Sequence, residues 1–87
     1  MNKRHRATLK AIFAHPTPSN IRWDDAVSLF KALGATIDKS REGSRVAILT
    51  ATRTGIYHKP HSGSSIGRAT VRDMMRQLQE EGIRPGK

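Results

Sequence analysis

Two histidines, His58 and His61, flank the dipeptide Lys59-Pro60. Imidazole can accept and return a proton near neutral pH. Metal-free cleavage of RNA needs both actions, a base for the ribose 2′-OH and an acid for the leaving 5′ oxygen. Pro60 stiffens the segment between the histidines, and functional side chains often lie on loops held by a sheet. The pair is therefore an acid–base candidate, and the alternative is that His58 packs at a strand end while His61 is exposed and idle.

No other group of residues has the composition of a catalytic or metal centre. The remaining histidines, His5 and His15, lie in a basic segment and before a proline, where we expect them to be solvated. Asp24 and Asp25 are adjacent, and adjacent side chains of a helix point in different directions. Cysteine is absent, which fits a cytoplasmic protein and excludes thiolate ligands. We expect no metal and no cofactor.

The charge of the chain indicates its partners. The 87 residues include 16 Lys and Arg against 7 acidic residues, a formal net charge of +9. Such an excess attracts nucleic acid, an anionic membrane or an acidic protein. A membrane is disfavoured because no apolar run exceeds four residues and no basic helix carries large apolar anchors on its opposite face. We therefore expect nucleic acid as the ligand or substrate and no membrane contact.

Hydrophobic periodicity predicts the elements that hold these residues. Residues 6–14 and 23–33 follow helical spacing, separated by the breaker cluster at 15–20. The period then changes over residues 35–41, strands are predicted over 44–50 and 56–59 with a turn at 52–55, and a last helix runs to residue 81. Gly34 and Gly82 are expected to cap helices. The order α-α-β-β-β-α predicts an α+β two-layer sandwich, with helices covering one face of a three-stranded antiparallel sheet.

Helical spacing also predicts the core side chains. These are Leu9, Ile12, Phe13, Trp23, Ala26, Val27, Phe30, Leu33, Val71, Met74, Met75 and Leu78.

Alternation along the strands predicts which side chains share a face. Val46 and Ile48 of the 44–50 strand belong in the core, so Arg45, Ala47 and Leu49 face the other way. In the next strand we expect Ile56 and His58 to face inward, because the opposite choice would bury Lys59. Tyr57 and Lys59 would then join Arg45 on an open face that stacks a base and holds phosphates. The alternative is an ordinary polar outer face.

The stretch before the last helix is a second candidate contact with RNA. Backbone N–H groups of residues 62–67 could bind an anion together with nearby cations, although capping of the helix by a serine is a simpler interpretation. Arginines that recur every four residues along the last helix form a stripe, which in most proteins is only a solvated face. The candidate RNA-binding residues outside the strands are Ser64, Ser65, Arg68, Arg72 and, at the predicted turn, Arg53.

The segment from Trp23 to Ile83 resembles the HicA toxins of bacterial toxin–antitoxin pairs. The matching pieces, in order, are a helix ending in Leu33-Gly34, the turn Gly43-Ser44, a strand running into Pro60-His61, and a final helix closing with Glu81-Gly82-Ile83. The resemblance implies a double-stranded-RNA-binding-like fold and an endoribonuclease that cleaves mRNA and blocks translation. It also implies an acidic HicB-like antitoxin as partner. We expect a single domain over residues 1–87, with residues 1–20 as an extension of a HicA-like core at 21–84.

The sequence departs from the family pattern at one position. The family's catalytic histidine directly follows Gly-Ser, where this chain has Arg45. Arginine stays protonated and cannot act as a base, but it can stabilise charge developing on a phosphate. Either the proton transfer lies with His58 or His61, or the chain is a non-catalytic RNA-binding module. A role limited to docking an acidic protein is a third interpretation.

Overall fold

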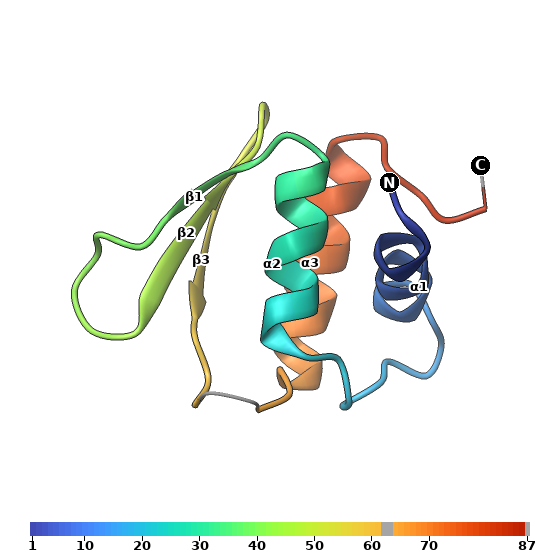
Figure 1. Ribbon diagram of the computed structural model, residues 1–87, viewed down its shortest axis with the longest axis horizontal. Helices are drawn as coiled ribbons and strands as arrows, with labels where there is room; N and C mark the ends of the chain where they lie inside the picture. Colours follow the sequence, from blue (N-terminus) through green and yellow to red (C-terminus); the bar gives the residue numbers. More distant parts are fainter. Residues whose placement is uncertain (62–63, 87) are drawn as a thin grey trace.

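The computed structural model describes residues 1–61 and 64–86 and confirms the predicted order of elements (Figure 1). Three strands form one antiparallel sheet in the order β1-β2-β3. The helices and strands are α1 (Lys3–Ile12), α2 (Trp23–Ala32), β1 (Thr36–Asp38), β2 (Arg45–Leu49), β3 (Thr54–His58) and α3 (Arg68–Glu80).

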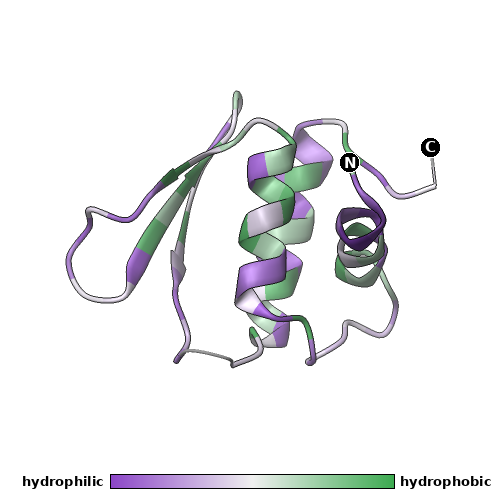
Figure 2. Ribbon diagram, in the orientation of Figure 1, coloured by the Kyte–Doolittle hydropathy of each residue, from purple (hydrophilic) through white to green (hydrophobic). Residues whose placement is uncertain are grey.

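The elements stack in layers. The sheet packs against α2 and α3, which gives the expected α+β sandwich and is consistent with a double-stranded-RNA-binding-like arrangement. Helix α1 lies on the other side of the α2–α3 layer, so the sheet and α1 are at opposite ends of the longest dimension of the molecule (Figure 1). In Figure 2 hydrophobic and hydrophilic residues alternate along the ribbons of α2 and α3, whereas the start of α1 is strongly hydrophilic.

Most of the predicted apolar residues form the core, whereas Phe13, Leu33 and Met75 are only half-buried and pack against it. The side chains of Phe30, Met74 and Leu78 have no exposed surface, and Trp23 is buried as expected. Periodicity did not single out several other buried side chains, among them Ile21, Leu29, Tyr57 and Ile66. Burial of these groups accounts for most of the stabilisation that a small domain can obtain.

Glycines end two helices as expected. Gly34 and Gly82 have φ values of +95° and +75°, in the left-handed region that residues with a Cβ avoid. The expectation for one histidine was wrong. His5 is not solvated but half-buried, with Nε2 2.8 Å from the hydroxyl of Ser28, because α1 docks onto α2. His15 is exposed as expected.

The turn between β2 and β3 lies earlier than the sequence predicted. Thr50 and Arg53 exchange backbone hydrogen bonds, so the loop is Ala51-Thr52, and Gly55 belongs to β3. No non-glycine residue in the described part of the chain has a positive φ, so this loop lacks the backbone geometry usual for two-residue hairpins.

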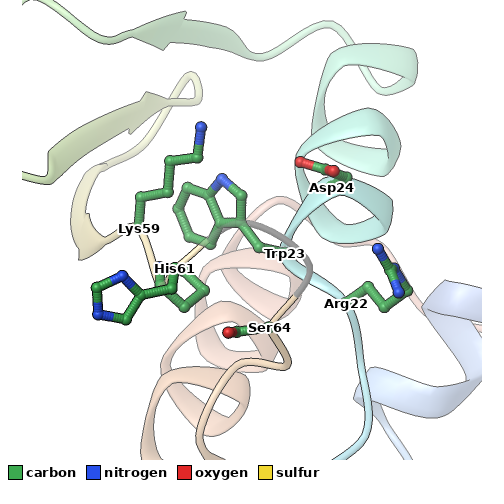
Figure 3. A pocket seen from close by; sticks show the side chains of 7 residues that line it. Arg22, Trp23, Asp24, Lys59, His61 and Ser64 are labelled. Atoms are coloured by element: carbon green, nitrogen blue, oxygen red, sulfur yellow. The ribbon is translucent and has the colours of Figure 1, made fainter.

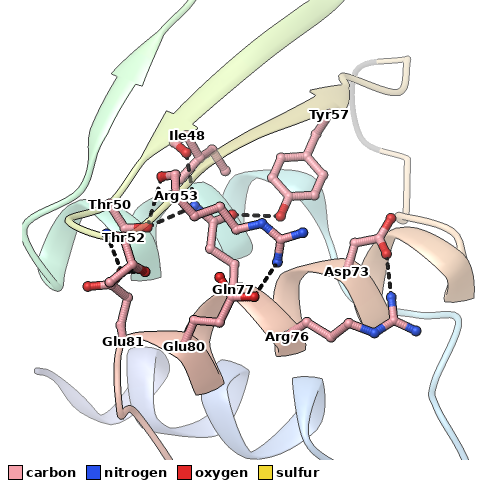
Figure 4. Close-up of polar contacts among 10 residues, drawn as sticks. All are labelled: Ile48, Thr50, Thr52, Arg53, Tyr57, Asp73, Arg76, Gln77, Glu80 and Glu81. Atoms are coloured by element: carbon pink, nitrogen blue, oxygen red, sulfur yellow. Dashed lines mark hydrogen bonds and ion pairs between the residues drawn. The ribbon is translucent and has the colours of Figure 1, made fainter.

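Helix α3 holds this turn in place. The carboxylate of Glu81 accepts hydrogen bonds from the backbone N–H of Thr52, at 2.9 Å, and from its hydroxyl (Figure 4). The hydrogen bond from the Thr52 hydroxyl, and to a smaller extent the one from its backbone N–H, keeps the pKa of Glu81 below its ordinary value.

Candidate functional site

The side chains of Arg45 and His58 lie side by side on the open face of the sheet. They are directly opposite in the β2–β3 register. The backbone N–H of Lys59 donates to the carbonyl of Ser44, at 2.7 Å, so Arg45 and His58 form the non-hydrogen-bonded type of pair, whose Cα atoms are about 4.5 Å apart. Both side chains are exposed. The open face therefore presents an imidazole directly beside a guanidinium.

A serine contacts the His58 ring. The hydroxyl of Ser44 lies 3.4 Å from Nδ1 of His58, at the long end of hydrogen-bonding distance. A contact at Nδ1 leaves Nε2 as the ring nitrogen available to a ligand. The sequence analysis did not single out Ser44 for this position, although its place before Arg45 in the predicted strand was the available signal.

The predicted parity of β3 was wrong. Tyr57 faces the helices and is 5% exposed, whereas Ile56 is 46% exposed and His58 is on the open face. The phenol of Tyr57 donates a 2.7 Å hydrogen bond to Oε1 of Gln77 on α3 (Figure 4). Burial raises the pKa of Tyr57 to about 12. Tyr57 therefore offers no surface on which an RNA base could stack.

Two features that are hidden in the sequence make room for Tyr57. Gln77 is fully buried, and its amide nitrogen donates to the carbonyl of Ile48 at 2.9 Å and the hydroxyl of Thr50 at 3.0 Å. Gly55 lies under this contact, where an added Cβ would be 2.4 Å from Gln77 Oε1 and 2.6 Å from the Tyr57 ring. A buried tyrosine needs a partner for its hydroxyl, and Gln77 supplies it.

Lys59 does not share the open face with Arg45. It follows the parity of Tyr57, and at the end of the sheet it lines a pocket of about 70 Å³ with Trp23, His61 and Ser64 (Figure 3). Arg22 and Asp24 line the same pocket and lie on the other side of the Trp23 indole. His61 is exposed. The pocket continues the site from the sheet towards the start of α2.

The remaining predicted RNA-binding cations lie elsewhere. Arg53 is at the hairpin turn, five strand residues or about 16 Å from His58, and it pairs with Glu80 at 3.3 Å (Figure 4). Arg68 donates to the carbonyl of Thr17 at 3.0 Å. Arg72 is an exposed residue of α3. These residues do not join Arg45 and His58 in one surface.

Neither candidate serine caps α3. The N-cap is Gly67, and no side chain caps the helix there. Ser65 instead forms an antiparallel bridge with Arg22, and the N–H of Ser64 donates to the carbonyl of His61 at 2.9 Å. Ser62 and Gly63, part of the predicted anion-binding stretch, lie outside the described residues.

Another cation lies beside Arg45. Arg41 lines a shallow pocket with Ser40, Glu42 and Arg45 in the connection between β1 and β2. Arg41 was not among the predicted site residues, because its position beside Arg45 depends on how the chain turns at Gly43, where φ is +66°.

The arrangement is suited to acid–base chemistry on an anionic ligand. The exposed His58 lies beside Arg45, which shares a pocket with Arg41, and the exposed His61 lines another pocket with Lys59, so each group offers an imidazole together with cations that could hold phosphate. Within residues 1–61 and 64–86, no group of three His, Cys, Asp or Glu side chains could hold a metal ion. The same part of the chain contains no helix long and apolar enough to cross a membrane.

Comparison with known proteins identifies the family. No curated protein and no solved structure matches the chain. The family model described as the HicA toxin of bacterial toxin–antitoxin systems matches residues 23–79, from the start of α2 almost to the end of α3. This match spans most of the chain and includes Arg45, His58 and His61, but not α1. The chain therefore belongs to the HicA toxin family, and it is a toxin of a toxin–antitoxin pair.

Proposed function

We propose that the protein is an endoribonuclease that cleaves mRNA without a metal ion and so blocks translation in the cytoplasm. The observation that carries the proposal is the pairing of Arg45 with His58 on the open face of the sheet. This pairing offers a substitute for the family's histidine after Gly-Ser, because the imidazole of β3 lies directly beside the position on β2 that arginine occupies. Arg45 cannot transfer a proton, but its neighbour can.

The proposed reaction divides three tasks among these side chains. One imidazole accepts the proton of the ribose 2′-OH as that oxygen attacks the adjacent phosphorus. The bond from phosphorus to the 5′ oxygen breaks, and the leaving oxygen takes a proton from the second imidazole, which leaves a 2′,3′-cyclic phosphate. Arg45 holds the phosphate and stabilises its extra negative charge. His58 and His61 are the proposed proton carriers, with Lys59 as a further phosphate ligand.

The test is cleavage of single-stranded RNA in EDTA by protein purified free of antitoxin. We expect cyclic phosphate ends, and we expect His58→Ala to lower the rate by about 10²- to 10⁴-fold, the usual contribution of a general acid or base. His15→Ala is the matched control, because it removes an exposed histidine that lies on the loop between α1 and α2. RNA left intact by the native protein between about pH 5 and pH 8, where imidazole titrates, would refute the nuclease.

A non-catalytic RNA-binding module is the second candidate, and Arg45 at the family's catalytic position favours it. Such a module would bind RNA without cleaving it. Its affinity would fall steeply between about 50 and 200 mM salt, because phosphate contacts release counterions. Intact RNA with salt-sensitive binding would support this candidate, whereas binding insensitive to salt would exclude it.

We further propose that an acidic HicB-like antitoxin covers the open face of the sheet. Ile56 and Leu49 are 46% and 37% exposed there, and protein interfaces combine such apolar anchors with complementary charge. Arg45 would pair with acidic groups of the antitoxin. Co-purification with an acidic protein, lost in Ile56→Asp but retained in Gln79→Asp on the exposed side of α3, would support this placement.

A further inference from the structure

The exposed side of α1 carries a row of cations outside the segment that matches the family. Of the ten residues of α1, four are Lys or Arg and none is acidic. Arg4 is engaged in an ion pair with Asp25 of α2 at 2.9 Å. The other three, Lys3, Arg6 and Lys10, are spaced three and four residues apart, which places them on one face of the helix. They span about 10 Å along the helix axis.

The opposite face fixes α1 to the rest of the molecule. Thr8, Leu9 and Ile12 are buried against the core, and Nε2 of His5 lies 2.8 Å from Ser28 Oγ. The row of cations is therefore displayed by a docked helix, and its orientation does not depend on a ligand.

Folding of α1 gains little from these cations. Lys3 and Arg6 lie in the first turn, where the positive end of the helix dipole disfavours cations. Arg6 and Lys10 are like charges four residues apart, which repel. The ion pairs of residues 1–61 and 64–86 involve Arg4, Arg53 and Arg76, and none involves Lys3, Arg6 or Lys10.

A fourth cation broadens the row. Arg84, from the segment after α3, lines one shallow pocket of about 180 Å³ with Arg6 and Lys10. Residues from both ends of the chain thus form one surface, which we call the α1 basic surface and define as Lys3, Arg6, Lys10 and Arg84. Its side chains are exposed.

The chemistry of this surface fits a polyphosphate backbone better than a protein. Among the described residues of and beside α1, Met1 is the only large apolar side chain that is more than half exposed. Protein interfaces are depleted in lysine and built on aromatic and apolar anchors, of which the open face of the sheet has two in Ile56 and Leu49. A row of Lys and Arg with one methionine as the only large exposed apolar neighbour that the structure describes is more typical of phosphate contacts.

We propose that the α1 basic surface binds the phosphate backbone of nucleic acid, separately from the site on the sheet. The layer of α2 and α3 lies between the two surfaces (Figure 1), in a molecule about 36 Å long. A nucleic-acid strand bound at the sheet must pass around the protein to reach α1. The α1 basic surface therefore adds affinity only for long nucleic acids, and it takes no part in cleavage. The proposal does not depend on whether the sheet site cuts RNA.

The test uses the full chain and a fluorescent 2′-O-methyl RNA of about 16 nucleotides, the upper end of the site size for small single-strand-binding domains. This RNA keeps its phosphates but lacks the 2′-OH, so cleavage cannot interfere. The variant Lys3→Gln/Arg6→Gln/Lys10→Gln removes three phosphate contacts. Each contact to a single strand contributes about 0.7 to the slope of log K against log salt, so we expect the slope to become less steep by about 2. Between about 50 and 200 mM salt the native chain then loses roughly 20-fold more affinity than the variant.

Matched measurements separate this result from loss of structure. Lys31→Gln removes an exposed lysine from the last turn of α2, as Lys10→Gln does from α1, and it should leave the slope unchanged. Thermal unfolding of the triple variant should occur near the native temperature, because loss of Lys3 and Arg6 relieves the positive end of α1 whereas loss of Lys10 removes a favourable cation from its last turn. Duplex DNA in place of the single strand shows which form of the backbone is preferred.

Two outcomes would overturn the proposal. One is an unchanged salt slope in the triple variant for both RNA and DNA. The other is a triple variant that binds polyglutamate more weakly than the native chain does but binds RNA and DNA as tightly. That result would assign the α1 basic surface to an acidic protein. Failure of the native protein to cleave ordinary RNA would refute the nuclease and leave this surface standing.

Discussion

Replacing Gly55 by alanine should destabilise the protein through a single added methyl group. The new Cβ would lie 2.4 Å from Gln77 Oε1 and 2.8 Å from the Tyr57 hydroxyl. Neither group can move freely, because the two are hydrogen-bonded to each other and Gln77 also bonds the carbonyl of Ile48. Overpacking costs about 1–3 kcal/mol, and breaking the Tyr57–Gln77 bond while both ends stay buried costs about 1–3 kcal/mol more. The sum, about 2–6 kcal/mol, is a large part of the roughly 5–15 kcal/mol that holds a domain together.

Urea and thermal unfolding followed by circular dichroism measure this loss. A domain of this size loses about 4–8 °C of Tm per kcal/mol, so we expect a drop of at least about 8 °C. Gly67→Ala is the matched control, since an added Cβ there meets nothing within 4 Å and should cost less than about 1 kcal/mol as a change of N-cap. Equal stability of Gly55→Ala and Gly67→Ala would refute the account of why Tyr57 faces the core.

The remaining predictions concern the same polar contacts. Tyr57 is the only tyrosine, so ultraviolet absorbance reports it alone, and in the folded protein it should ionise near pH 12 rather than near its ordinary value of about 10. Because the pKa of Tyr57 is higher in the folded than in the unfolded protein, the stabilisation by its neutral phenol is complete below about pH 10 and is lost as the pH rises towards 12. Ionisation of Tyr57 near pH 10, before the protein unfolds, would contradict the buried geometry. Glu81 has a lowered pKa, so its contribution is present above its ordinary pKa and is lost on acidification. Thr52→Ala removes the hydroxyl donor and should move the Glu81 pKa upward in a carboxyl NMR titration, and an unchanged value would show that the hairpin turn is not held by this contact.

Local signals were sufficient for most of the fold. The helices begin and end within a few residues of the predicted positions, because periodicity, Gly34 and Gly82 act within one or two turns of the chain. The strand over Arg45–Leu49 was predicted with the correct residues facing the helices. The predicted turn at 52–55 was wrong because Gly55 suggested a loop, whereas the structure uses that glycine for close approach inside β3.

The candidate site was harder to predict, since its composition depends on register. Arg45 and His58 are thirteen residues apart in the sequence, and only the pairing of β2 with β3 places them opposite each other. The same pairing moves Arg53 to the far end of the sheet. Avoidance of a buried lysine gave the wrong parity for β3, because Lys59 lies past the last strand residue and reaches solvent at the end of the sheet.

The sequence by itself determined that this is a basic chain with α-α-β-β-β-α order and a HicA-like core, because charge, periodicity and helix caps are properties of the residues and their near neighbours. Only the tertiary structure decided that Tyr57 of β3 faces the core and that His58 lies on the open face. A fully buried glutamine on α3 and a glycine on β3 accommodate the Tyr57 hydroxyl, and that contact turns His58 outward beside Arg45. Such long-range complementarity between a helix and a strand has no counterpart in local sequence.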